Sequence, residues 1–322
     1  MKPSITAYIT RVLHILPGCF FAVILAGLLS LSPISLNAAY SLQHKTNNLA
    51  VYAEEPIPGN MIIGLNKLDE RIDELQSTIS IYINEPAVIY IAKNNTSYQR
   101  LALGKAKIVE FSDAFYSGMD ASIYIRPAVE IRESFSNTLL HEYIHWYLEK
   151  IFSHAPLWFH EGMATHFSGQ MGFERYLYFL QQSFLGRSSD LFRMSYSYPD
   201  KQEDWQIFYL SSSMAVRFMN ENKAQEWKHF WDMVASITRN GDKAAFNDVF
   251  GVAYRSNLYD FHIQFATYVK RLRYQYLFWG INSILALLLP VVLIIGHRIK
   301  RKRMAMLPDF PELEEDDGED FG

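Results

Sequence analysis

The pattern of apolar positions predicts a short strand-containing part followed by a longer helical part. Apolar side chains recur at three- and four-residue steps in residues 61–79, which indicates an amphipathic helix. Short β-branched and aromatic runs predict strands at 80–83, 87–92 and 122–126, and residues 94–103 predict a short helix. Further helices are predicted at 134–151, 156–168, 173–185, 205–221, 224–238, 243–250 and 257–272, with a loop at 186–204. This segregation of strands and helices indicates the α+β class.

The first 39 residues have the pattern of a targeting segment. Lys2 and Arg11 precede an apolar run over 16–36, and the small residues Ala38 and Ala39 follow it. This charged, apolar, small order is typical of a secretory signal. We therefore expect residues 1–39 to be a signal peptide or, if they are not cleaved, an N-terminal anchor.

A second apolar segment, residues 276–296, predicts a transmembrane helix. It contains no charged side chain and is long enough to cross a bilayer. A dense Lys/Arg cluster follows at 297–303, and the positive-inside rule then predicts a cytoplasmic C-terminus. Residues 40–275 are expected to form one extracytoplasmic domain. Residues 297–322 are expected to form a cytoplasmic tail, basic at first and then acidic.

Composition narrows the choice of partners and of metal ligands. Hydrophobic residues make up 49% of the chain and aromatic residues 15%, so a sizeable core is expected. The net charge is −4 and no basic cluster lies within 40–275, so nucleic acid is not an expected partner. The lone cysteine, Cys19, lies in the leader. Any metal in the folded part must therefore be held by histidines and carboxylates.

Residues 141–145, His-Glu-Tyr-Ile-His, carry the strongest chemical signal. On the predicted helix His141 and His145 project from one face, so their imidazoles can hold one Zn²⁺. Glu142 follows the first histidine and can act as general base toward water at the metal. A histidine six residues after His145 would indicate a metzincin, but Ile151 stands there.

A third ligand is expected, because catalytic zinc usually takes three protein ligands. The candidates downstream are His154, His160, Glu161 and His166. Glu161 is favoured: Pro156 starts a second helix, and Gly162 and Ala164 are small enough to let it pack closely on the first. His160 points about 100° away from Glu161 on a helix, so both cannot easily bind one ion. We interpret His154 and His166 as ordinary polar residues.

The two motifs together resemble the peptidase MA-like members of the gluzincin clan. His-Glu-x-x-His is followed by Pro-x-Trp-Phe-x-Glu-Gly-x-Ala at 156–164, and the resemblance extends over about 60–270. Weaker similarities lie at 209–216 and 246–251. The resemblance implies a zincin-like catalytic domain, Zn²⁺ as cofactor, Glu161 as third ligand and a polypeptide substrate. It also suggests residues 122–126 as the edge strand that pairs with substrate.

These observations predict a membrane-anchored zinc metallopeptidase that hydrolyses extracytoplasmic proteins or peptides. Tyr209 is a candidate donor to the oxyanion, although a core aromatic residue is the commoner role for such a tyrosine. The alternative function is a non-catalytic metal-binding or scaffold protein of the cell envelope. The intact Glu142 favours the enzyme. An intramembrane protease is disfavoured, because Glu133, Asn137 and Glu149 make the first motif helix too polar.

Overall fold

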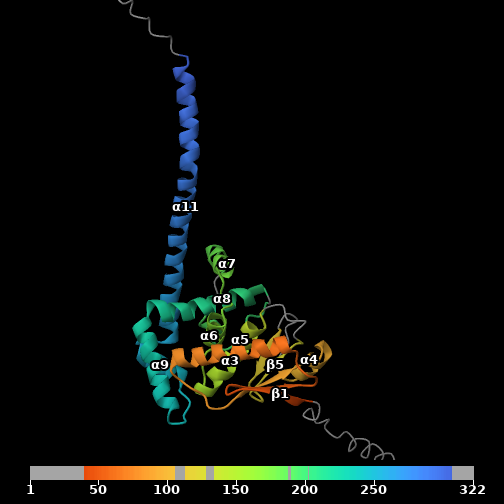
Figure 1. The fold of residues 1–322 in the computed structure, drawn as a ribbon. Coiled ribbons are helices and arrows are strands. Elements are labelled where there is room, and N and C mark those ends of the chain that lie inside the picture. The colour runs from red at the N-terminus through yellow and green to blue at the C-terminus, as the bar shows by residue number, and fades with distance from the viewer. Residues whose placement is uncertain (1–39, 106–112, 128–133, 188–189, 202, 307–322) are drawn as a thin grey trace, which may run out of the picture.

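The computed structural model describes residues 40–105, 113–127, 134–187, 190–201 and 203–306. The predicted leader at 1–39 and the acidic end of the tail, from 307 onward, lie outside these residues. The α+β class is confirmed. A five-stranded sheet is built from the N-terminal part, and helices make up most of the C-terminal part (Figure 1).

The sheet has the strand order β1-β2-β3-β5-β4, with parallel pairing in its centre and antiparallel pairing at both edges. The elements that form or flank it are β1 (Ser41–Lys45), β2 (Leu49–Ala53), α3 (Gly59–Ile79), β3 (Ala87–Ile91), α4 (Asn95–Ala102), β4 (Ala114–Ser117) and β5 (Ser122–Ile125). The predicted helices at 61–79 and 94–103 and the strands at 87–92 and 122–126 therefore form, while β1, β2 and β4 were not predicted.

The predicted strand at 80–83 is wrong. Ser80 ends α3 in the left-handed conformation with φ of 61°. The amide of Ile83 donates to the side chain of Gln76 at 2.8 Å and not to a neighbouring strand. The β-branched run is therefore the connection that leaves the helix. Its apolar Ile81 is buried by packing against the core, which produces the same apolar pattern as a strand.

Each face of the sheet carries a different row of side chains. Val51, Ile89 and Ile123 stand in register on the face that packs into the main core with α3. On the other face Tyr52, Tyr90, Tyr124 and Phe115 form a row of stacked rings, with centroids 5.0–5.5 Å apart. Helix α4 covers part of this aromatic row.

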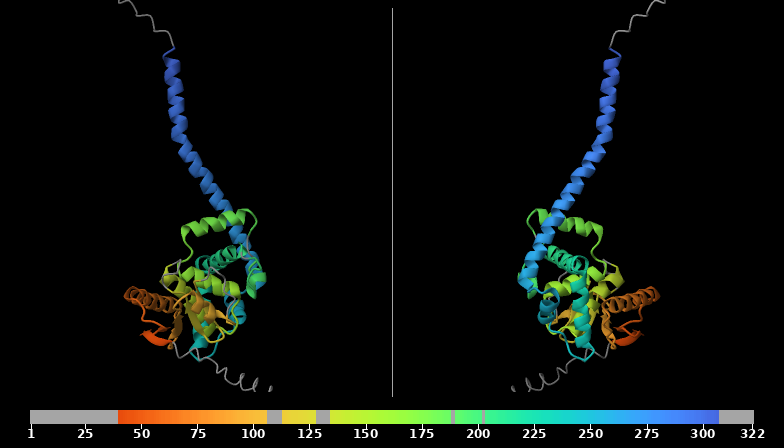
Figure 2. Two further views of the ribbon diagram at one scale, coloured as in Figure 1. Left: turned by 90° about the vertical axis from the view of Figure 1, so that its right-hand side faces the viewer. Right: turned by 90° about the vertical axis from the view of Figure 1, so that its left-hand side faces the viewer.

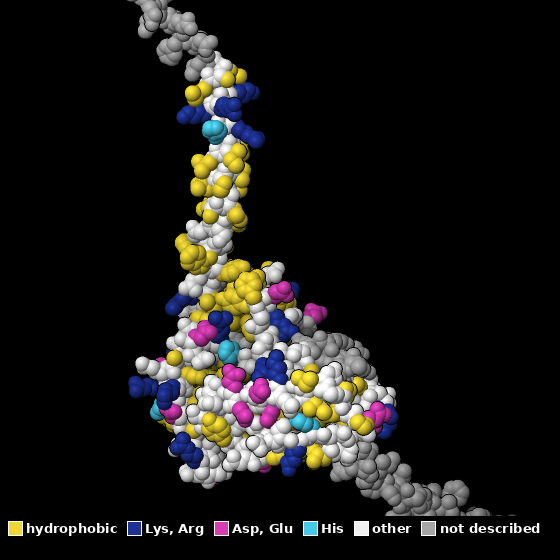
Figure 3. Space-filling view, viewed as in Figure 1, with side chains coloured by type: hydrophobic (Ala, Val, Ile, Leu, Met, Phe, Trp, Pro, Cys, Tyr) yellow, Lys and Arg dark blue, Asp and Glu magenta, His cyan; other side chains and the backbone are white. Residues whose placement is uncertain are grey.

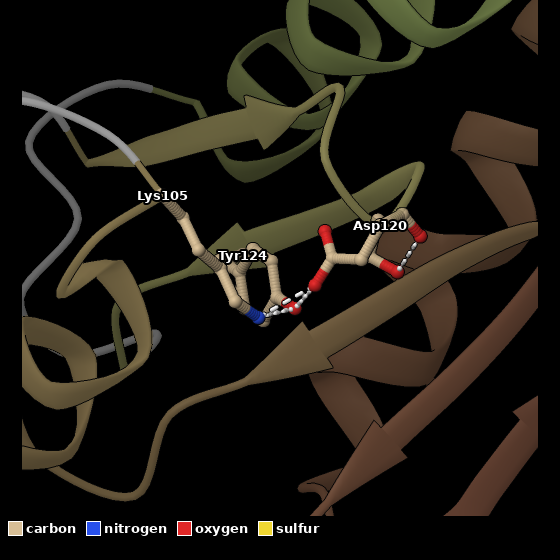
Figure 4. A network of polar contacts seen from close by, with 4 residues as sticks. Lys105, Asp120 and Tyr124 are labelled. Carbon is tan, nitrogen blue, oxygen red and sulfur yellow. Dashed lines mark hydrogen bonds and ion pairs between the residues drawn. The ribbon is translucent and has the colours of Figure 1, made fainter.

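A polar network is attached to Tyr124 of the aromatic row (Figure 4). The carboxylate of Asp120 accepts hydrogen bonds at 2.5 Å from Lys105 Nζ and from the Tyr124 hydroxyl. Burial alone would raise the pKa of Asp120, but these hydrogen bonds outweigh it and hold the pKa below its ordinary value. The network therefore ties the turn between β4 and β5 to the segment after α4.

The expectation that residues 122–126 form the edge strand of the sheet is wrong: these residues form β5, which is an inner strand. It lies between β3 and β4, and β4 pairs with it antiparallel from Ala114 to Ser117. Both hydrogen-bonding edges of β5 are therefore occupied. The edge strand on this side of the sheet is β4, which lies against the helix of the first motif.

The helical part begins with α5, which carries the first motif. Its helices are α5 (Phe135–Ile151), α6 (Leu157–Phe167), α7 (Phe173–Phe184), α8 (Glu203–Arg217), α9 (Ala224–Thr238), α10 (Phe246–Tyr254) and α11 (Leu258–Met304), with a 3-10 turn at Arg193–Ser195 and a π-helical turn at Phe218–Asn222. Helix α10 starts and ends later than the predicted 243–250. An aromatic cluster that includes Phe152, Phe159, Phe230 and Phe246 joins α5, α6, α9 and α10.

Helix α6 makes its closest approach to α8, not to α5. A methyl group added at Gly162 would lie 2.4 Å from the carbonyl oxygen of Ser212 and 2.7 Å from Val216 Cγ2. The expectation that Gly162 allows close packing on the first motif helix is therefore corrected: this glycine lets α8 approach α6 from its other side. Pro156 is the residue before the helix, with extended backbone angles, and not its first helical residue.

The predicted helices at 257–272 and 276–296 are one continuous helix, α11, of 47 residues (Figure 1). Phe261, Phe265 and Val269 bury one face of its first turns in the core, and Phe261 stacks on Trp158 of α6 at 5.4 Å. The apolar stretch beyond these turns is unburied, and it makes α11 the candidate membrane span among the described residues. Figure 3 shows hydrophobic side chains along its middle and Lys and Arg side chains beyond them.

We expect Gly162→Ala to destabilise the protein by about 1–3 kcal/mol, because its methyl group would overlap the α8 backbone. Gly251→Ala is the matched control, since this helical glycine of α10 has nothing within 4 Å of an added Cβ. Chemical denaturation of the two purified variants measures the difference in unfolding free energy. Equal stabilities would contradict the close contact between α6 and α8.

Candidate metal centre

The first two candidate ligands lie one turn apart on α5, as their spacing predicts. The rings of His141 and His145 have centroids 4.9 Å apart and are steeply inclined, at 73°. The opposite side of α5 is buried: Tyr143, Ile144 and Tyr147 lie in the main core. The four-residue spacing places both imidazoles on one side of α5, and the buried side fixes the direction in which they face.

Glu161 joins these histidines from α6. Its Oε2 lies 3.4 Å from His141 Nε2 and 3.6 Å from His145 Nε2. One ligand atom from each of the three residues lies within 4.8 Å of the others, and this is the metal-capable group found among the described residues. The structure thus brings together the three residues that the two motifs singled out.

The donor atoms of this group suit a divalent metal such as zinc. Glu161 is only 2% exposed, yet its Oε2 has no hydrogen-bond partner. A buried carboxylate oxygen without a partner is costly, and an ion placed between it and the two imidazoles would satisfy it. Two histidine nitrogens and one carboxylate oxygen are also the ligand set of one known class of catalytic zinc sites.

The protonation states also favour metal binding by two of the three residues. Burial lowers the pKa of His145 to about 3, so its imidazole is neutral. Burial acts to raise the pKa of Glu161, but electrostatic interactions with His145 and His141 and the hydrogen bond from Tyr198 lower it to about 2. For His141, burial acts to lower the pKa, but the nearby carboxylates of Glu161 and Glu142 outweigh it, so the pKa lies above its ordinary value. Because a histidine must be deprotonated to bind a metal, this raised pKa makes metal binding at His141 depend more strongly on pH.

Glu142 lies beside this group but is held by a different element. Its Oε2 accepts a hydrogen bond of 2.8 Å from the backbone amide of Tyr116 in β4. Burial raises the pKa of Glu142 to about 7, with Glu161 adding to the rise and His141 and the Tyr116 amide opposing it. A carboxylate with such a pKa is suited to exchange protons near neutral pH.

Tyr198, which sequence analysis missed, holds the other oxygen of Glu161. Its hydroxyl donates to Glu161 Oε1 at 2.5 Å. The ring stacks on Trp205 of α8, at 5.1 Å between centroids, which positions the hydroxyl. Tyr198 comes from the stretch predicted as a loop, 37 residues after Glu161, and no spacing rule connects the two.

Arg71 of α3 links the two helices that carry the candidate ligands. Its Nη1 donates to Asn137 at the start of α5 at 2.7 Å, and its Nη2 donates to the carbonyl of Ser168 at the end of α6 at 2.9 Å. The cation therefore also lies at the C-terminal end of α6, where the helix dipole favours positive charge. The role of Arg71 could not be predicted from the sequence either, because its partners lie 66 and 97 residues away.

The other candidate residues lie outside the metal-capable group of His141, His145 and Glu161. The His160 ring stacks on His145 at 5.9 Å, and His160 is outside the metal-capable group. Tyr209 of α8 approaches the His141 ring edge-on, at 6.5 Å between centroids. It therefore lies next to the metal-capable group. His154 and His166 are also outside the group.

A scan against protein-family models and a search of curated proteins each found no match. Among solved structures, the chain is similar to the crystal structure of an aminopeptidase N family protein from Idiomarina loihiensis, with 13% sequence identity and a TM-score of 0.43. The alignment covers 70% of this chain and 46% of that one, so the chain spans less than half the length of that protein. A likeness this distant leaves the site to be judged from its own residues.

We expect zinc to raise the melting temperature of the protein, because an ion that binds only the folded state stabilises it, by about 2.7 kcal/mol at 100 times its dissociation constant. Glu161→Gln and His145→Ala should each lose most of this shift, since the first replaces a charged carboxylate ligand by a neutral amide and the second removes an imidazole. His154→Ala, an exposed histidine outside the group, is the control and should keep it. A shift of wild-type size in Glu161→Gln would exclude Glu161 as a ligand.

Tyr198→Phe should weaken zinc binding by about 10- to 100-fold, because outer partners orient metal ligands. Tyr196→Phe in the same segment is the matched control, as Tyr196 is exposed. Competition with a chromogenic chelator measures both affinities. Equal affinities would show that the Tyr198 hydroxyl does not position Glu161.

Proposed function

We propose that this chain is a membrane-anchored zinc metallopeptidase that hydrolyses peptide bonds of extracytoplasmic proteins or peptides. The observation that carries the proposal is the convergence of His141, His145 and Glu161 on one point, with Glu142 next to it. The His-Glu-x-x-His motif and the second motif supply the same residues from sequence alone. Glu142 has no role in a purely structural metal site, and this favours an enzyme over a binding or scaffold protein.

The three converging residues would hold the zinc ion, which when bound supplies Lewis acidity toward a water molecule and a carbonyl oxygen. Glu142 acts as the general base: it accepts a proton from the attacking water and passes it to the amine that leaves. The Tyr116 amide keeps one oxygen of Glu142 in place. Among the described residues, no hydrogen bond holds the other oxygen, which we assign to accept the proton. Tyr209 is our candidate for a hydrogen bond to the developing oxyanion.

Strand β4 is the element suited to align a polypeptide. It is the outer strand of the sheet on the side of α5, and its Tyr116 contacts α5 twice, through the amide to Glu142 and through the hydroxyl to Glu149 at 2.8 Å. An extended chain that paired with the outer edge of β4 would run past Glu142. We therefore assign to β4 the substrate-pairing role that sequence analysis had given to residues 122–126.

We further propose that residues 276–296 cross the membrane and that residues 40–275 form the extracytoplasmic domain. The uncharged stretch lies within α11, and the Lys/Arg cluster at 297–303 follows it directly. These residues favour a cytoplasmic C-terminus. Residues 1–39 would then direct the chain to the membrane as a signal peptide or an N-terminal anchor, and residues 297–322 would form the cytoplasmic tail.

We expect Glu142→Gln to retain zinc and to lose peptide hydrolysis by at least about 100-fold, because the amide cannot accept the proton. Glu74→Gln, which changes an exposed glutamate of α3, is the control. Metal content is measured on the purified full chain, and cleavage is followed with an unfolded protein or a peptide library. Cleavage by Glu142→Gln at the wild-type rate would remove the peptidase assignment. Zinc binding by a wild-type chain that cleaves no polypeptide would favour the non-catalytic alternative.

A further inference from the structure

Helix α7 has a partly exposed apolar side. Phe173 is 74% exposed and Phe184 is 44% exposed. These two residues are eleven apart, about three turns, so they lie on the same side of the helix, with Leu177 between them. We call these three residues the apolar side of α7. Leu185, directly after the helix, is 65% exposed and extends this surface.

This apolar side lies where the unburied part of α11 begins. The carbonyl of Ser183 in α7 accepts a hydrogen bond of 2.7 Å from Arg273 of α11. At the other half of α7, burial is the main reason that the pKa of Tyr176 is raised, and the nearby Tyr276 of α11 adds to the rise. Arg273 and Tyr276 are one helical turn apart, and Tyr276 is the first residue of the uncharged stretch.

Helix α7 is oriented as expected for a helix that lies on a membrane surface where α11 enters the bilayer. Figure 2 shows α7 as the green helix that lies across the base of α11, at the edge of the domain from which the long helix emerges. Figure 3 shows hydrophobic side chains gathered in the same region, where α7 meets α11. A helix that crosses the direction of a membrane span lies roughly parallel to the plane of the bilayer.

The domain cannot turn freely about the span, because α11 is a single helix anchored in the core. Phe261, Phe265 and Val269 fix its first turns. The exposed Lys270 and Arg271 follow, just before the uncharged stretch, and the exposed Arg187 follows α7. Basic side chains at this level would lie beside lipid phosphates, with the apolar side chains of α7 somewhat deeper.

We infer that α7 is an interfacial helix that lies on the lipid bilayer and inserts Phe173, Leu177 and Phe184 among the headgroups and upper acyl chains, holding the domain against the membrane. The occupant of this surface is therefore lipid and not a second protein. This inference rests on the membrane span of the proposed function and is independent of the peptidase activity.

Site-specific fluorescence of the full chain in nanodiscs tests this inference. The lone cysteine is removed as Cys19→Ser, and single cysteines are introduced at Phe173, Phe184, Leu287 and Ile63 for labelling with an environment-sensitive nitrobenzoxadiazole dye. Leu287 reports on the span. Ile63, an apolar side chain of α3 that is 71% exposed, is the matched control. The nanodiscs contain phosphatidylcholine and phosphatidylglycerol, with lipids spin-labelled either near the headgroup or in the middle of the chain.

The expected result is a blue-shifted emission at positions 173 and 184 and a loss of fluorescence that is stronger with the headgroup-proximal quencher. Position 287 should be quenched more strongly by the mid-chain label, and position 63 by neither. Equal depth at 173 and 184 is required, because an upright helix would separate them by about 16 Å.

Three outcomes would overturn the inference. If 287 is quenched while 173 and 184 behave like 63, the membrane anchor stands and the interfacial helix does not. If only one of 173 and 184 is quenched, α7 does not lie along the surface. If 287 is not quenched either, the membrane span itself is wrong, and the interfacial helix fails with it, whereas the metal centre is unaffected.

Discussion

The candidate metal centre depends on one buried carboxylate oxygen, Oε2 of Glu161, held close to the Nε2 atoms of His141 and His145. Removing a carboxylate from water is costly unless positive charge or hydrogen bonds replace the lost hydration. Tyr198 satisfies the other oxygen, and the two imidazoles face Oε2. The residues around this oxygen therefore prepare a position for a cation, and a metal would complete the balance of charge.

The rest of the helical part keeps that oxygen in place. Glu161 is carried by a helix of only eleven residues, which by itself would be marginally stable in water. Its position comes from its neighbours: α8 meets it closely at Gly162, Phe261 of α11 stacks on Trp158, and Arg71 ties its C-terminal end to α5. The arrangement of the ligands is thus a property of the packed core rather than of either motif.

Helix α11 connects this core to the candidate membrane segment without a flexible joint. Its first turns belong to the aromatic core, and the same helix continues into the uncharged stretch. A span of this kind would set both the distance and the tilt of the domain relative to a bilayer. Under the proposed function, the short edge strand β4, which contacts Glu142 and Glu149, would be held at a fixed height above the membrane.

The amino-acid sequence by itself determined what depends on neighbours a few residues apart. The helices of the C-terminal part, the four-residue spacing of His141 and His145 and the uncharged stretch of α11 are all local patterns. The tertiary structure alone decided that β4 and not β5 is the edge strand, that Gly162 meets α8, and that Tyr198 and Arg71 support the ligand helices. Apolar periodicity reports which side of an element is buried, but it does not identify the partner. Contacts across tens of residues arise only when the packed chain brings their ends together.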